Sequence, residues 1–182
     1  MKNVLVLGLF SACVLALPAS AQVDPGKGEI GAGVGYTSFD SNKSISNTNE
    51  AGTALGVRGG YSFTKLFELE GQFADTSASD SGVDLTMNTY MVNAVFNFHP
   101  KATIVPYVLG GLGRADLSFD TPSGSFSDGS NAVQVAVGSR FFFGAKRKAG
   151  LRVELASLSE KTFDENSIHN DLNVGFTWRF GR

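Results

Sequence analysis

Eight charged residues fall inside segments that otherwise read as apolar β-strands, and they are the side chains best placed to do chemistry. They are Arg58, Glu68, Glu70, Arg114, Arg140, Arg152, Glu154 and Arg179. Each occupies a position that alternates with apolar residues, so all eight are expected on the polar faces of strands. Because a buried charge must be paired, the pattern predicts ion pairs that plug a narrow, low-dielectric interior. The functional alternative is a gate whose pairs exchange partners and briefly pass ions.

The two histidines and the glycine-rich start of the chain are weaker candidates. His99 stands at a strand end and is interpreted as an interface residue, whereas His169 lies near Glu165 and Asp171. A Ser/His/acid hydrolase would also need a serine on an adjacent strand end. No His/Asp/Glu spacing resembles a tight metal site, and no helix follows the glycines of 31–35 as a dinucleotide loop would require. The sequence therefore predicts no catalytic residue, no metal site and no cofactor.

Strict alternation of apolar and polar residues organises the chain. It is clearest near the end, where Leu172, Val174, Phe176, Trp178 and Phe180 share one face. The same pattern predicts eight strands, at about 29–39, 53–63, 67–73, 85–98, 105–114, 133–143, 151–156 and 172–180. Short turns and longer polar loops (about 40–52, 75–84, 119–130 and 157–170) alternate between them. The fold class is therefore all-β, an eight-stranded antiparallel up-and-down barrel. In the fifth strand, whose two faces are both largely apolar, Tyr107 is placed outward and Arg114 inward.

Three features predict that the apolar face meets lipid. All seven lysines after Lys2 fall in loops, turns or the leading segment, although a solvated strand face normally carries lysine. Turning the strand charges outward would cost about 2–4 kcal/mol for each arginine at the bilayer midplane. Aromatic residues also gather near the short turns, as in the girdle of a transmembrane barrel. The predicted girdle consists of Tyr61, Phe63, Phe67, Phe98, Tyr107, Phe143, Trp178 and Phe180. A secreted soluble barrel that binds an apolar ligand remains the alternative.

The first residues read as a targeting segment. Lys2, an apolar run from Val4 to Leu17, and the small residues of 19–21 predict a cleaved secretory signal peptide at 1–21. Residues 22–182 then form one barrel domain in the cell outer membrane. The only cysteine, Cys13, lies in the removed segment, so no disulfide is expected. Removal of Lys2 leaves 14 basic and 17 acidic residues, which argues against a nucleic-acid partner.

The two ends of the predicted barrel differ in charge. The short turns carry Lys65, Lys101, 146–148 and no acid, whereas the long loops are rich in Asp and Glu. In transmembrane barrels the short turns face the periplasm and the long loops the exterior. The acidic outer surface is expected to serve solubility, or divalent cations bridging it to lipopolysaccharide. Outer-membrane lipid and host or surface ligands at the loops are the other expected partners, and a monomer is expected.

Several short segments resemble the OmpA-type eight-stranded transmembrane barrel, within the small outer-membrane β-barrel family of surface antigens. They are 59–61, 67–69, 109–111, 114–116, 151–154 and 172–181. The resemblance implies a lumen in which Glu68 and Arg152 correspond to family charges. Val95 and Arg140 depart from that pattern, so the family's gating scheme is not carried over. The peptidoglycan-binding domain that follows many such barrels is not expected after Arg182. The expected role is structural or surface-interactive, as in adhesion or surface antigens, with a lipid A-modifying enzyme or a narrow ion channel as alternatives.

Overall fold

The computed structural model describes residues 25–39, 51–80, 83–100, 102–121, 124–144, 147–162 and 165–181. The predicted signal peptide lies outside these residues, as do Lys101, Lys146 and most of the first expected loop. Among the described residues, no helix has the length and apolar character needed to cross a bilayer.

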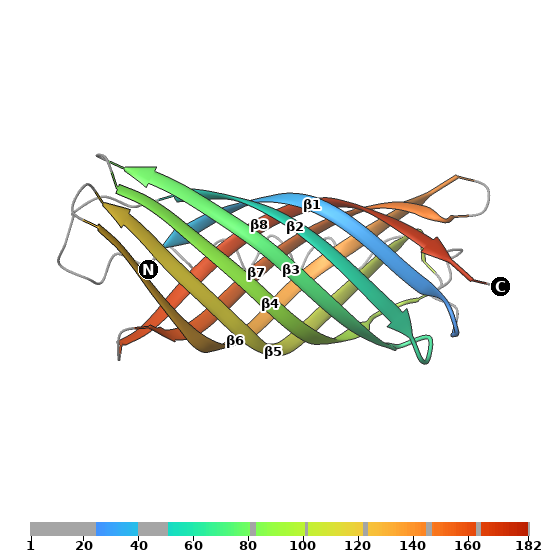
Figure 1. Ribbon diagram of the computed structural model, residues 1–182. Helices are drawn as coiled ribbons and strands as arrows, with labels where there is room; N and C mark the ends of the chain where they lie inside the picture. The colour runs from blue at the N-terminus through green and yellow to red at the C-terminus, as the bar shows by residue number, and fades with distance from the viewer. Residues whose placement is uncertain are drawn as a thin grey trace, which may run out of the picture.

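Eight strands form one closed antiparallel barrel in which every strand pairs with its neighbours in sequence, and β1 pairs with β8 (Figure 1). Their bounds are β1 Gly28–Phe39, β2 Ala51–Ser62, β3 Phe67–Asp80, β4 Val83–Asn97, β5 Ile104–Thr121, β6 Gly124–Phe143, β7 Ala149–Thr162 and β8 Glu165–Phe180. The predicted fold class is confirmed.

The pairing register fixes how far the strands are staggered around the wall. The row of paired residues that starts at Glu29 passes through every strand and returns to β1 at Phe39, ten residues further along. Such a stagger requires the strands to tilt strongly, as Figure 1 shows. An eight-stranded barrel is just wide enough for its own side chains to fill, so inward residues must pack against one another.

The outer wall is apolar and the interior is mainly polar over the part nearest the short turns. On β8, Phe176 and Trp178 are each 45% exposed, whereas Thr177 and Arg179, which alternate with them, are buried. The same alternation holds on β1 to β4, β6 and β7 with the predicted phase. Side chains that would be buried in a soluble protein therefore form the outer surface of this barrel, as a lipid-facing wall requires.

The predicted phase of β5 was wrong. Val105, Tyr107 and Leu109 are buried, whereas Val108 and Leu112 are exposed. Because both faces of β5 are apolar, alternation could not predict which face points inward. The inward face is determined by the polar partners of Tyr107 and by the room for its ring. Gly138 on β6 stands opposite Tyr107, and a Cβ atom there would clash with the tyrosine hydroxyl. The glycine therefore leaves room for the ring inside the barrel.

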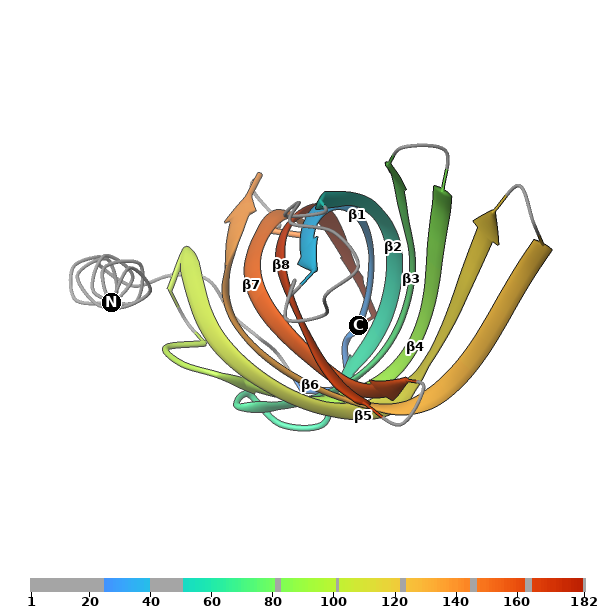
Figure 2. The same cartoon turned by 90° about the vertical axis from the view of Figure 1, so that its left-hand side faces the viewer.

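Three of the expected loops are largely strand. β3 ends at Asp80 and β4 begins at Val83. In the same way, β5 ends at Thr121 and β6 begins at Gly124, and β7 ends at Thr162 and β8 begins at Glu165. Their Ser, Asp and Gly residues do not alternate with apolar ones because neither face of a hairpin beyond the bilayer meets lipid. The backbone ladder nevertheless continues. Figure 2 looks onto this end, where the green β3–β4 and gold β5–β6 hairpins project from the wall.

The interior near the projecting hairpins contains a buried apolar cluster beside polar side chains such as Glu160 and His169. The cluster draws its side chains from β4, β5, β6 and β7. It comprises Leu85, Met87, Met91, Ala115, Leu117, Ala132 and Leu158. None of these residues exceeds 7% exposure, so the cluster packs as the core of a soluble β-protein does.

Candidate functional site

Arg152 on β7 is the centre of a buried charge network. Its Nη2 atom donates to Glu154 Oε2 at 2.6 Å, and its Nη1 atom donates to Glu70 on β3. The Nε atom donates to the hydroxyl of Tyr107 at 2.6 Å, and that hydroxyl donates to Glu154 Oε2 at 2.6 Å. One guanidinium thus connects three strands across the interior.

A second group of ion pairs lies nearer the short turns. Arg140 on β6 is completely buried and donates to Glu68 Oε2 at 2.7 Å. Its Nε atom lies 3.3 Å from Glu29 Oε1, and its Nη1 atom lies 3.3 Å from Asn97 Oδ1. Arg179 on β8 donates to the other oxygen of Glu29 at 2.7 Å. Arg140 also lies 3.8 Å from a carboxylate oxygen of Glu70, which Arg152 binds, so the two groups are continuous.

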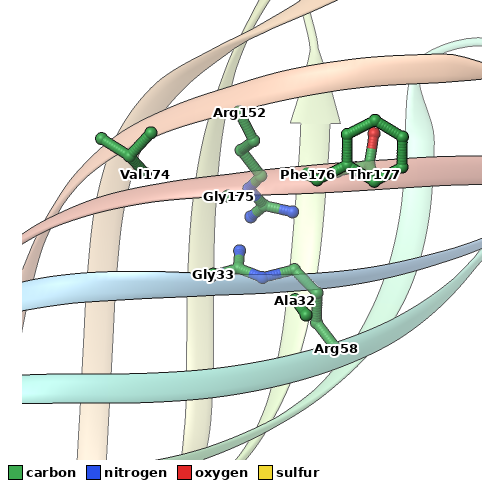
Figure 3. Close-up of a pocket in the computed structure, with 8 residues that line it drawn as sticks. All are labelled: Ala32, Gly33, Arg58, Arg152, Val174, Gly175, Phe176 and Thr177. Carbon is green, nitrogen blue, oxygen red and sulfur yellow. The ribbon is translucent and has the colours of Figure 1, made fainter.

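Arg58 on β2 approaches the network from the opposite wall. Its Nη1 atom lies 3.5 Å from Glu70 Oε1 and 3.4 Å from Glu154 Oε2. Figure 3 shows Arg58 and Arg152 pointing toward one another. Two like charges can approach because the same two carboxylates contact both. Four arginines and four glutamates, counted among the described residues of this network, therefore balance one another.

Glycines in the facing wall make room for these guanidinium groups. A small cavity lies between β1 and β8 beside Arg58 and Arg152 (Figure 3). There Gly33 pairs with Gly175, and a Cβ atom on Gly33 would lie 2.7 Å from the Val174 carbonyl oxygen. Side chains from the other strands therefore reach across to a wall that carries none of its own at this level.

Tyr107 supports the two central arginines through its ring as well as its hydroxyl. The guanidinium carbons of Arg140 and Arg152 lie 5.0 and 4.5 Å from its ring centroid, within the range of cation–π attraction. At the short-turn end, Arg179 lies 3.8 Å from the centroid of Phe142 in the same manner. The aromatic rings thus stabilise the arginines without adding negative charge to a network in which arginines and glutamates are already equal in number.

Replacing Tyr107 by phenylalanine is expected to destabilise the barrel by about 1–3 kcal/mol, because the hydrogen bonds that the hydroxyl makes with Arg152 and Glu154 are lost inside the protein. The ring and its cation–π contacts remain. The free energy of unfolding, measured by denaturant titration of the refolded protein in vesicles, checks this. Tyr90→Phe on the exposed outer face is the matched control and should change stability little. Equal effects of the two substitutions would contradict the buried role of Tyr107.

Seven of the eight predicted lumen charges lie in this network, and Arg114 does not. The Arg114 side chain is 60% exposed and pairs with Asp116 at 2.6 Å on the outer side of β5. Glu29, Tyr107 and Asn97 belong to the network but were not among the eight predicted ion-pair residues. Glu29 shares the parity of Gly31 on β1, so the alternation itself could have revealed it. Tyr107 and Arg114 were both misplaced by the same error in the phase of β5.

Seven of the eight predicted girdle residues lie on the outer face near the short turns, and Tyr107 lies inside. Ring contacts connect them with Phe96, which was not predicted: Phe96 lies 5.1 Å from Phe67 and 5.0 Å from Phe98 between ring centroids. Tyr61 and Phe63 are 5.1 Å apart. Their placement is that of a belt at one interface, and we propose this role for them.

The two histidines lie at opposite ends of the barrel. His169 points into the barrel, where its Nε2 atom lies 3.3 Å from Glu160 Oε1. The hydroxyl of Ser130 donates to the other Glu160 oxygen at 2.7 Å rather than to the histidine. His99 lies in the turn after β4 with a positive φ of 48°. Within the described ranges, no group of three or more His, Cys, Asp or Glu side chains could hold a metal ion.

The comparisons with known proteins agree with this geometry. The family model described as "Outer membrane protein beta-barrel domain" matches residues 6–180. Neisserial surface protein A is similar in structure, with a TM-score of 0.72 and 13% identity over 85% of this chain and 99% of that one. The attachment invasion locus protein Ail of Yersinia pestis has a TM-score of 0.60 and 18% identity, over 86% of this chain and 99% of that one. The outer membrane protein OprG of Pseudomonas aeruginosa has a TM-score of 0.59 and 13% identity, over 88% of this chain and 99% of that one. No curated protein sequence matches the chain.

At these identities the structural likeness establishes the fold alone, whereas the family match covers nearly the whole sequence. It also accounts for the apolar outer wall and the charged interior. The expected resemblance to small outer-membrane barrels is confirmed, and the chain belongs to the outer membrane protein β-barrel domain family.

Proposed function

We propose that this outer-membrane barrel is a non-enzymatic, monomeric surface protein, with a lumen plugged by ion pairs and with projecting hairpins that interact outside the membrane. The proposed route to the membrane is secretion with a signal peptide at 1–21. The observation that carries the surface role is the β5–β6 hairpin, which remains paired out to Thr121 and Gly124. Ordered structure beyond the bilayer is not needed to span it, so a role in contact or adhesion accounts for it best.

The acidic character of the projecting end indicates what the hairpins contact. Asp75 and Asp116 face outward on either side of β4, both paired with Asn88 in the register, and Asp116 also forms an ion pair with Arg114. Carboxylate oxygens are ligands for Ca²⁺ and Mg²⁺, which would bridge this end to the phosphates of lipopolysaccharide. Ail has been crystallised in complex with the heparin analogue sucrose octasulfate. An acidic end would repel such a polyanion, so we do not extend that ligand to this chain.

Shortening the β5–β6 hairpin tests the surface role. Residues 118–127 are replaced by Asn-Gly, which joins Leu117 to its partner Asp128 through a two-residue turn. The barrel should still reach the outer membrane and change gel mobility only on boiling. Adhesion of the expressing cells to a surface should fall to the level of cells without the protein. Unchanged adhesion with an intact barrel would remove the hairpin from the proposed function.

The interior provides two barriers in series, and we therefore expect no ion conduction. The charge network lies near the short turns, and the apolar cluster around Met87 and Leu117 lies nearer the hairpins. A dry apolar constriction blocks ions even when charges below it rearrange. In planar bilayers, wild-type protein and the Glu68→Ala variant should both give no conductance steps. Steps that change in Glu68→Ala, but not in an Asp116→Ala control, would instead favour the narrow channel.

The enzymatic alternative has its own test. A site that hydrolyses lipid A would be expected on the lipid-facing wall, whereas His169 is buried in the interior. Deletion of the protein should leave the lipid A of the cell unchanged by mass spectrometry. A modification that disappears on deletion and with His169→Ala would identify an enzyme.

A further inference from the structure

We propose that the short-turn end of the barrel carries a binding surface for the anionic headgroups of phospholipids, here called the basic rim. Its described cations are Lys27, Lys65, Arg147 and Lys148. Lys65 and Lys148 are exposed, and the other two are half-buried. Lys27 precedes β1, Lys65 lies between β2 and β3, and the remaining pair lies between β6 and β7, so the cations come from both sides of the barrel.

Backbone hydrogen bonds hold the basic rim against the ends of the strands. The carbonyl of Lys27 accepts from Ser62 N at 3.0 Å, which fixes it beside the end of β2. The carbonyl of Lys148 accepts from Arg179 N at 2.7 Å, beside the end of β8. Arg147 closes the β6–β7 turn by donating from its backbone N to Gly144 O at 3.1 Å. The cations are therefore placed at a defined level of the barrel.

Among the described residues, no acid forms an ion pair with Lys65, Arg147 or Lys148. Glu29 and Glu68 lie at the same end, but both are buried and bind Arg179 and Arg140 in the interior. The outward-facing acids of the described strands, Asp75 and Asp116, lie beyond the opposite edge of the apolar wall. The described surface charges of the short-turn end are therefore all positive.

The depth of the rim matches that of phosphate groups. Trp178 pairs with Ala149, the residue after Lys148, and its side chain is 45% exposed to the outside. Phe63, two residues before Lys65, is 59% exposed. Because aromatic side chains of membrane proteins gather at headgroup level, the adjacent cations lie beside lipid phosphates. Each Lys or Arg near an anionic surface favours binding by about fivefold.

The barrel contains its own reporter for this surface, because Trp178 is the only tryptophan in the sequence. The full barrel is reconstituted in phosphatidylcholine vesicles that contain phosphatidylglycerol, with bromine on the acyl chains of one lipid or the other. Quenching by brominated phosphatidylglycerol should exceed its bulk share several-fold in the wild-type protein. The variant Lys65→Gln/Arg147→Gln/Lys148→Gln should lose this preference, and high salt should weaken it in the wild type.

The double variant Asp75→Asn/Asp116→Asn is the matched control, since it also changes surface charge but at the far end. It should retain the wild-type preference. Equal quenching by both lipids in the wild-type protein, or full preference in the triple variant, would overturn the proposal and favour another anionic partner in the periplasm. If the triple variant does not fold, Lys65→Gln alone changes one exposed turn residue and should lose about fivefold. The result is independent of the hairpin adhesion test.

Discussion

Replacing Arg152 by alanine is expected to destabilise the barrel by about 3–5 kcal/mol, the usual cost of removing one partner from a buried ion pair. The guanidinium contacts Glu70 and Glu154, and all three residues are at most 2% exposed. Its removal leaves Arg58 as the remaining cation near both carboxylates, at 3.5 and 3.4 Å. The free energy of unfolding of the refolded protein, from guanidinium titration in vesicles, measures the loss.

The matched control is Arg114→Ala, which removes the same kind of side chain from an ion pair of 2.6 Å. That pair is 60% and 42% exposed, and exposed pairs contribute about 0–1 kcal/mol. A large difference between the two variants is therefore expected. Similar losses would mean that the interior network is hydrated and contributes no more than a surface pair.

The sequence was sufficient to predict which residues of most strands face outward, because a lipid-facing wall requires a simple alternation. Every second residue must be apolar, so Phe176 and Trp178 faced outward and Arg152 and Glu154 inward without any knowledge of their partners. The number and order of strands followed from the same rule. The family match is consistent with this, because it spans residues 6–180 although each quoted motif is short.

The alternation rule fails where contact with lipid does not distinguish the two faces of a strand. In β5 both faces are apolar, so Tyr107 and Arg114 were each placed on the wrong side. The hydroxyl of Tyr107 belongs inside with Glu154, and the charge of Arg114 is tolerated outside because it lies beyond the lipid-facing row. The projecting hairpins were read as loops for the same reason, since neither of their faces meets lipid.

The partners within the network could not be predicted from sequence, because they depend on the stagger of the strands. Glu29 and Arg179 are 150 residues apart but adjacent on β1 and β8. Arg58 and Glu154 lie on β2 and β7, which are not neighbours in the wall, and meet only across the interior. Such contacts require the diameter of the closed barrel, which local alternation does not contain.

An arginine introduced at Val57 should destabilise the protein by about 2–4 kcal/mol in phospholipid vesicles, the cost of a charge at the bilayer midplane. Val57 is 55% exposed in the middle of the outward row of β2, between Ala32 and Phe73 of the neighbouring strands. The equivalent change at Thr53, four residues nearer the hairpin end of β2, should cost only about 0–1 kcal/mol because Thr53 lies near the membrane interface.

The comparison of these two positions separates a lipid-facing wall from a wet one. Both are exposed positions on the same face of the same strand, so strand propensity and local packing change in similar ways. If water covered the wall, an arginine would be tolerated at both, and the unfolding free energies would agree within a few tenths of a kcal/mol. A depth-dependent cost arises only if hydrocarbon surrounds Val57, because desolvation of the guanidinium increases toward the midplane. The difference between the two variants therefore measures the membrane environment of the wall directly.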